Sequence, residues 1–222
     1  MRTGVRSAGA EVARRDRAWG AQIVVLAAIL LDLSLPSKLT IGPAWLLPSV
    51  EGILLVGLVV ASPDPHVGGS PHRRRLAIAM IGMVSVVNIF SLFELVHYLL
   101  HGGKENGRQL VLAGVVLWVT NVLLFGLWYW LLDRGGPATR GAVPESDADF
   151  LFPQMAEPRV GPEGWLPTLI DYLYVSFTNA TAFSPTDTMP LTANAKLLMA
   201  AQSLVSLVTI GLVVARAVNI LS

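Results

Sequence analysis

The chain has 222 residues, of which 53% are hydrophobic and 14% are charged, and its mean hydropathy is +0.59. Apolar runs of membrane-spanning length recur along it, so we expect an integral membrane protein. The formal net charge of +1 gives no reason to expect a nucleic-acid partner, and the absence of cysteine excludes disulfide bonds and thiolate metal sites.

The first half of the chain contains a basic arm and a three-helix peripheral membrane region. The arm, residues 1–18, carries five arginines, and we expect it to be disordered or to lie on the membrane surface. No small-residue cleavage site follows the first apolar stretch, so we expect no removal as a signal peptide. Region 19–108 contains three hydrophobic segments, predicted as helices because lipid offers no partner to an unpaired backbone group. They lie at about 19–35, 43–61 and 76–101.

The second half, residues 109–222, has the layout of a pore module. Its predicted parts are an outer helix at 109–132, a loop at 133–165, a pore helix at 167–181, a filter-like loop at 182–190 and an inner helix at 193–221. The pore helix would be only about 22 Å long at 1.5 Å per residue, which is too short for a hydrocarbon core of about 30 Å. We therefore predict a re-entrant half-helix that is buried in protein or faces a water-filled cavity.

The filter-like loop offers oxygen atoms to a cation. It comprises Thr181, Ala182, Phe183, Ser184, Pro185, Thr186 and Asp187. The C-terminal end of the half-helix would direct its partial negative charge toward this loop. On the inner helix, Gln202, Ser206 and Thr209 form a polar stripe that we predict to line a pore. The alternative is that these polar residues are ordinary contacts between helices in a membrane.

The loop also keeps the register of a known module. Thr181 stands where a filter threonine would be, Asp187 where an aspartate follows the filter, and Pro190 where a proline precedes the inner helix. Segment 109–221 thus resembles the two-helix pore module of potassium channels. Ser184-Pro185-Thr186 replaces Gly-Tyr-Gly, and a proline cannot adopt the positive φ that glycines supply in that filter. The resemblance implies a channel scaffold without strong potassium selectivity.

A second resemblance covers almost the whole chain. Four hydrophobic segments are followed by Phe152-Pro153, by a Tyr-x-Ser-Phe-Thr motif at 174–178 and by a Ser-x-x-Asp-Thr turn at 184–188. In this order the features look like a family of uncharacterised bacterial multi-pass membrane proteins. That resemblance implies an architecture and no established activity.

The third hydrophobic segment carries ionisable residues, which are costly in a membrane and are therefore candidate sites. Glu94, His97 and His101 share one helix face, and two histidines four residues apart have the spacing of metal ligands. The cluster could serve a proton- or metal-coupled secondary transporter. The alternatives are a buried Glu–His hydrogen-bonded pair and a helix end at the membrane interface.

Basic residues predict the orientation. The arginine-rich arm and Arg73-Arg74-Arg75 lie on the same side if each segment spans, and the positive-inside rule makes that side cytoplasmic. The filter-like loop would then face the cytoplasm, opposite to a potassium channel. If the weak first segment does not span, the orientation of the loop reverses.

Together these features predict an all-α integral membrane protein with five transmembrane helices plus a re-entrant pore helix and loop before the last helix. We expect it in the cell (plasma or inner) membrane, as a homo-oligomer and most simply a tetramer, in contact with the lipid bilayer and inorganic cations. The predicted function is passive, weakly selective cation permeation with no cofactor beyond the permeant cation. The alternatives are the secondary transporter and a non-conducting structural membrane protein. We expect no enzyme, because the sequence has no Ser-His-Asp order and no phosphate-binding loop.

Overall fold

The computed structural model describes residues 19–32, 71–100, 107–137, 139–157, 164–184 and 187–221. Most of these residues are helical. The long helices are α2 (Trp19–Asp32), α4 (Pro71–Leu100), α5 (Gly107–Leu132), α7 (Leu169–Ala182) and α8 (Ala193–Leu221). The basic arm and the predicted segment at 43–61 lie outside the described residues.

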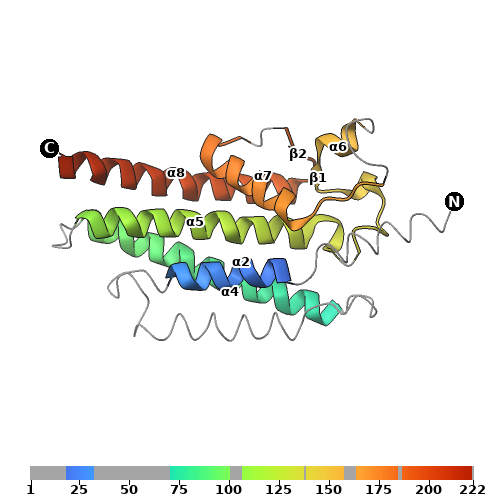
Figure 1. Ribbon diagram of the computed structural model, residues 1–222, viewed down its shortest axis with the longest axis horizontal. Helices are drawn as coiled ribbons and strands as arrows, with labels where there is room; N and C mark the ends of the chain where they lie inside the picture. Colours follow the sequence, from blue (N-terminus) through green and yellow to red (C-terminus); the bar gives the residue numbers. More distant parts are fainter. Residues whose placement is uncertain are drawn as a thin grey trace.

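Helix α5 is the centre of the bundle, and the other four long helices pack against it (Figure 1). Helices α7 and α8 lie on one side of α5, and α2 and α4 lie on the other. The segment of α5 that is apolar enough to span is 56% buried within the chain, whereas the corresponding segment of α8 is only 22% buried. Helix α8 therefore leaves most of its surface for lipid or for other proteins.

Three of the described helices are long and apolar enough to cross a membrane, which fits a helical membrane protein. The candidate spans are Arg74–Leu99, Gly107–Gly135 and Ala193–Val218. The first predicted segment is described as α2, whose 14 residues are fewer than the ~20 that a span requires.

Two glycines of α5 allow its neighbours to approach closely. A Cβ added to Gly126 would lie 2.6 Å from Cδ2 and 3.2 Å from Cα of Leu173 on α7. A Cβ at Gly114 would overlap a methyl group of Val213 on α8. Small residues of this kind are typical of helix interfaces in membranes, where packing rather than the hydrophobic effect holds helices together.

Helix α7 stands where the sequence predicts the half-helix. It begins with a capping box, in which Asp171 Oδ2 accepts hydrogen bonds from the backbone N–H and the hydroxyl of Thr168, each at 2.7 Å. It ends at Phe183, whose left-handed conformation (φ 53°) stops the helix. In Figure 1, α7 runs along only part of α8, and strand β2 (Met189–Pro190) lies back at the end where α8 begins.

The predicted loop at 133–165 contains several short elements. They are the 3₁₀ helices η2 (Asp133–Gly135) and η3 (Glu145–Asp147), strand β1 (Phe150–Leu151) and helix α6 (Pro153–Ala156). Strand β1 pairs antiparallel with β2, so that Phe150 is opposite Pro190. Phe150 and Phe152 are buried in the main core, which explains why this segment folds onto the bundle.

Candidate functional site

A line of buried polar side chains joins α5, α7 and α8. Gln202 on α8 is its centre. The side-chain oxygen of Gln202 accepts hydrogen bonds from the hydroxyl of Tyr129 at 2.6 Å and from Nδ2 of Asn179 at 2.8 Å. Its nitrogen donates to the backbone oxygen of Ser176 at 3.0 Å and to Oγ of Ser176 at 2.6 Å. Every hydrogen-bonding group of this buried amide is thus in use.

The line continues in both directions along the interface. Asn179 also donates to the backbone oxygen of Met199 at 3.0 Å, and Asn121 on α5 donates to Oγ of Ser206 at 3.0 Å. We call the group the polar seam. Its members are Asn121, Tyr129, Ser176, Asn179, Gln202 and Ser206.

The stripe that the sequence predicts as pore-lining lies in or beside this seam. Gln202 and Ser206 are 0% exposed and Thr209 is 1% exposed. Thr209 donates to the backbone oxygen of Val205, one turn earlier on the same helix, at 2.7 Å. In the single chain these residues make contacts between and within helices, as the alternative interpretation of the stripe describes, and the pore-lining role stays a prediction.

The filter-like loop gathers at the exposed C-terminal end of α7. Its described members, Thr181 through Ser184 and Asp187, are all exposed, and Pro185 and Thr186 lie outside the described residues. The hydroxyl of Thr181 donates to the backbone oxygen of Phe177 at 2.8 Å. Because the last carbonyl groups of a helix have no partner within it, this end carries partial negative charge and suits a cation.

The predicted Glu94–His97–His101 cluster is described only in part. Glu94 is half-buried and His97 is exposed on α4, where its ring stacks on Phe93 with 6.4 Å between centroids. His101 lies outside the described residues. In the part of the chain that the structure describes, no three His, Cys, Asp or Glu side chains are grouped to hold a metal ion. A metal role for this cluster stays a prediction.

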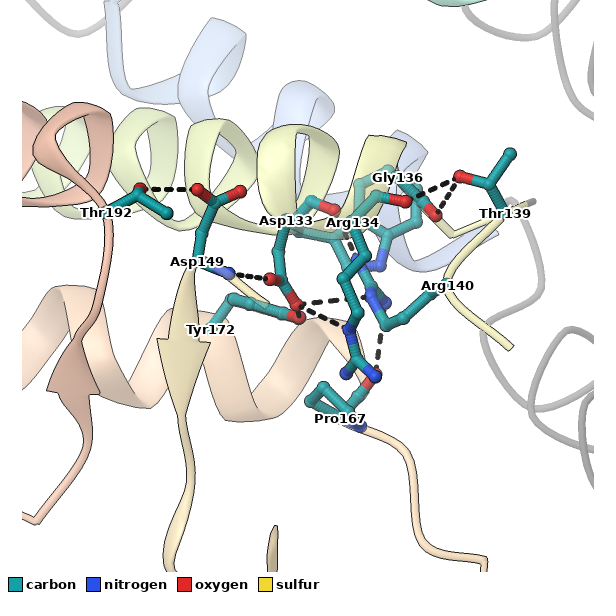
Figure 2. A network of polar contacts seen from close by, with 10 residues as sticks. Asp133, Arg134, Gly136, Thr139, Arg140, Asp149, Pro167, Tyr172 and Thr192 are labelled. Atoms are coloured by element: carbon teal, nitrogen blue, oxygen red, sulfur yellow. Dashed lines mark hydrogen bonds and ion pairs between the residues drawn. The ribbon is translucent and has the colours of Figure 1, made fainter. Parts of the chain in front are cut away.

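An ionic cluster at the end of α5 was not predicted from the sequence. Its centre is Asp133, which is fully buried (Figure 2). One carboxylate oxygen lies 3.5 Å from Nε of Arg134 and 3.7 Å from Nε of Arg140, and it accepts a short hydrogen bond from the hydroxyl of Tyr172. The other oxygen accepts from the backbone N–H of Asp149 at 2.8 Å.

Arg140 ties the loop to the start of α7. Its guanidinium donates to the backbone oxygen of Pro167 at 3.0 Å and to that of Trp130, and its Cζ lies 4.7 Å from the ring centroid of Tyr172. Burial raises the pKa of Tyr172 well above its usual value, although the charge of Arg140 acts in the opposite direction. The phenol therefore stays protonated at neutral pH and can donate to Asp133.

The same network reaches the start of α8. Asp149 accepts a hydrogen bond from the hydroxyl of Thr192, and that hydroxyl oxygen accepts from the backbone N–H of Ala195 at 3.2 Å, which caps α8. The cluster therefore fixes the end of α5, the start of α7 and the start of α8 relative to one another. Sequence alone gave no sign of it, because charged residues that flank a span look alike whether they face water or each other.

Comparisons with models of known protein families, with curated proteins and with solved structures give no match. What the polar seam, the ionic cluster and the end of α7 can do must therefore be argued from their own chemistry.

Proposed function

We propose that the protein is a channel-like membrane protein that forms a homo-oligomeric pore for passive, weakly selective cation permeation. The observation that carries the proposal is the place of α7. This half-length helix ends in exposed polar residues. It packs against α5 and α8, which are both long enough to span a membrane.

A hydrogen bond between α7 and α5 supports a position of α7 near mid-membrane. Ser176 donates to the backbone oxygen of Val122 at 2.6 Å, and Val122 lies ten residues before Leu132, the last residue of α5. Ten helical residues correspond to about 15 Å, which is near the middle of a hydrocarbon core of about 30 Å. The C-terminal end of α7, at Ala182, lies six residues further along.

Lipid cannot satisfy the polar groups at this depth. Unpaired backbone groups in hydrocarbon each cost several kcal/mol, so irregular backbone is tolerated only against protein or a water-filled cavity. Thr181, Ser184 and Asp187 are exposed at the end of α7. In our proposal, other copies of the chain surround this end and leave a water-filled path beside it.

The charge of this path favours cations. The carbonyl end of α7 and the carboxylate of Asp187 both attract positive charge. Selectivity would come from hydroxyl groups and from the width of the constriction, because the glycines of a potassium filter are absent from the loop. We therefore expect small monovalent cations to pass with little discrimination among them.

The uncovered faces of α7 and α8 support assembly. Exposed apolar side chains on these helices include Ile170, Phe177, Leu197, Leu204 and Val214. In our proposal, neighbouring copies cover part of this surface around a central axis, most simply in a tetramer. The fold would have five spans with a cytoplasmic N-terminus. Three are the candidate spans, and the other two would be the segment at 43–61 and a longer form of α2.

Single-channel recording of the purified protein in planar bilayers tests this function. We expect discrete cation currents whose amplitude falls severalfold in Asp187→Asn, because the mouth then loses a charge that concentrates cations. Glu94→Gln serves as the matched control, since it removes a carboxylate from α4. Absence of conductance under all ionic conditions would refute the pore. Saturable, proton-coupled flux that is lost in Glu94→Gln would instead support the secondary transporter.

A further inference from the structure

A groove of about 470 Å³ opens at the end of the bundle where α4 and α8 begin. Its walls come from four places: the start of α4, the end of α5, the segment around β1 and the first turns of α8. Arg74 and Asp149 supply its charges, and Leu197 and Leu198 supply part of its apolar wall. Its volume falls in the range of ordinary small-molecule sites, about 300–1,000 Å³.

The two charges in the groove are not paired with each other. Nε of Arg74 is buried and has no hydrogen-bond partner among the described residues. One oxygen of Asp149 accepts from Thr192, and the backbone N–H of Asp149 donates to Asp133. Among the residues drawn in Figure 2, none donates a hydrogen bond to its second carboxylate oxygen. An arginine and a carboxylate with spare capacity thus line one small groove.

The groove lies where candidate membrane spans begin and end. Two candidate spans begin there, Arg74–Leu99 and Ala193–Val218, and the span Gly107–Gly135 ends there. Headgroups flank the hydrocarbon core at the depth where spans begin and end. Below the charges, Leu197 is 70% exposed and continues the uncovered apolar face of α8. An occupant would therefore have a charged head and an apolar tail.

We propose that this groove binds a phospholipid with a phosphate and a primary ammonium group, of the phosphatidylethanolamine type. The phosphate lies against Arg74, the ammonium group donates to Asp149, and an acyl chain follows Leu197 along α8. A purely anionic headgroup fits less well, because Asp149 repels it. A choline headgroup has no N–H to donate to the carboxylate. This site does not depend on ion permeation.

Native mass spectrometry of the detergent-purified protein, titrated with lipids of identical acyl chains, tests the site. We expect phosphatidylethanolamine to bind the unaltered protein about tenfold more tightly than phosphatidylcholine or phosphatidylglycerol, as charge-assisted hydrogen bonds suggest. Arg74→Gln should weaken the binding of phosphatidylethanolamine about tenfold. The neighbouring Arg75→Gln, at an exposed position, should leave it unchanged.

Asp149→Asn distinguishes the role of the ammonium group. This variant keeps an oxygen for Thr192 but loses the negative charge, so it should abolish the preference for phosphatidylethanolamine and strengthen phosphatidylglycerol. Equal binding of the three lipids by the unaltered protein would overturn the proposal, and that result depends on no variant folding. Unchanged binding in Arg74→Gln would overturn it as well. If free phosphoethanolamine bound as tightly as the lipid, the acyl-chain contact would be refuted.

Discussion

Gln202 donates to Ser176 and accepts from Tyr129 and Asn179, and so it connects three helices with one amide. The seam around it is the reason why a half-length helix can stay in place. Its polar groups would be costly to bury singly, and together they satisfy one another. At the end of the bundle, Asp133 also connects several buried polar groups, because it lies between two buried arginines and Tyr172.

Replacing Gln202 by leucine should destabilise the protein. Tyr129, Asn179 and Ser176 would each lose a partner while remaining buried, at a total cost of about 1–3 kcal/mol. Thermal unfolding in detergent, followed by circular dichroism, measures the effect. Gln109→Leu makes the same change at an exposed position at the start of α5 and should be nearly neutral. Equal melting temperatures for the two variants would show that the seam contributes no stability.

At the scale of the element, α7 depends on a glycine of another helix. The backbone of α7 lies so close to Gly126 that any larger residue there would meet Leu173. With the Thr168–Asp171 capping box at its start and Phe183 at its end, α7 has a fixed length and a fixed position along α5. Both properties matter for the proposed pore, since they determine where the exposed carbonyl groups lie.

Gly126→Ala should displace α7 from α5. The added methyl group would lie 3.2 Å from the Leu173 backbone, and overpacking of this kind costs about 1–3 kcal/mol. Gly211→Ala on α8 is the matched control, because no heavy atom lies within 4 Å of the added Cβ. Hydrogen exchange of the 169–182 segment should rise in the first variant alone. Equal exchange in both would contradict the close approach of α5 and α7.

At the scale of the whole molecule, α5 is the most covered of the three candidate spans and α8 is the least covered. Helix α5 is enclosed, whereas α8 presents exposed leucines and valines along its length. In a membrane such a face suits lipid as well as protein, so apolar exposure alone does not give the oligomeric state. Our proposal of neighbouring copies rests instead on the exposed polar end of α7 on the same side.

Cross-linking can locate the interface between copies, because the chain has no cysteine of its own. A cysteine in place of Leu204 on α8 should give linked dimers with a short bifunctional thiol reagent in native membranes. Ile23→Cys on α2 is equally exposed, at 63%, and should give none if α2 faces lipid. The opposite pattern would move the interface to the other side of the bundle.

The orientation of the molecule has its own test. Ser146 is exposed within η3, at the end of the bundle that holds the ionic cluster. With a cytoplasmic filter-like loop, Ser146→Cys should resist a membrane-impermeant thiol reagent in intact cells and react after permeabilisation. Labelling in intact cells would place this end outside, as in a potassium channel.

Hydrophobic patterning was enough to predict the long helices. The helices expected at 109–132, 167–181 and 193–221 correspond closely to α5, α7 and α8, because an apolar run of given length has few stable forms in lipid. The short length of 167–181 also indicated that this segment does not cross a membrane by itself.

The partners of the polar residues could not be predicted in the same way. Gln202 and Ser206 were recognised as a stripe, but a stripe does not reveal whether it faces water, another copy or the same chain. The pairing of Asp133 with Arg140 depends on the path of a loop that has no repeating pattern. Contacts of this kind are set by tertiary packing, which periodicity does not encode.

The polar seam also bears on how the chain is made. Its central residue, Gln202, is on α8, which follows α5 and α7 in the chain, and the groups that it contacts belong to those two earlier helices. Until α8 enters the membrane, Tyr129, Ser176 and Asn179 lack the partner that makes their burial favourable. If α7 is the re-entrant helix that we propose, a chain that stops before α8 should leave α7 at the membrane surface.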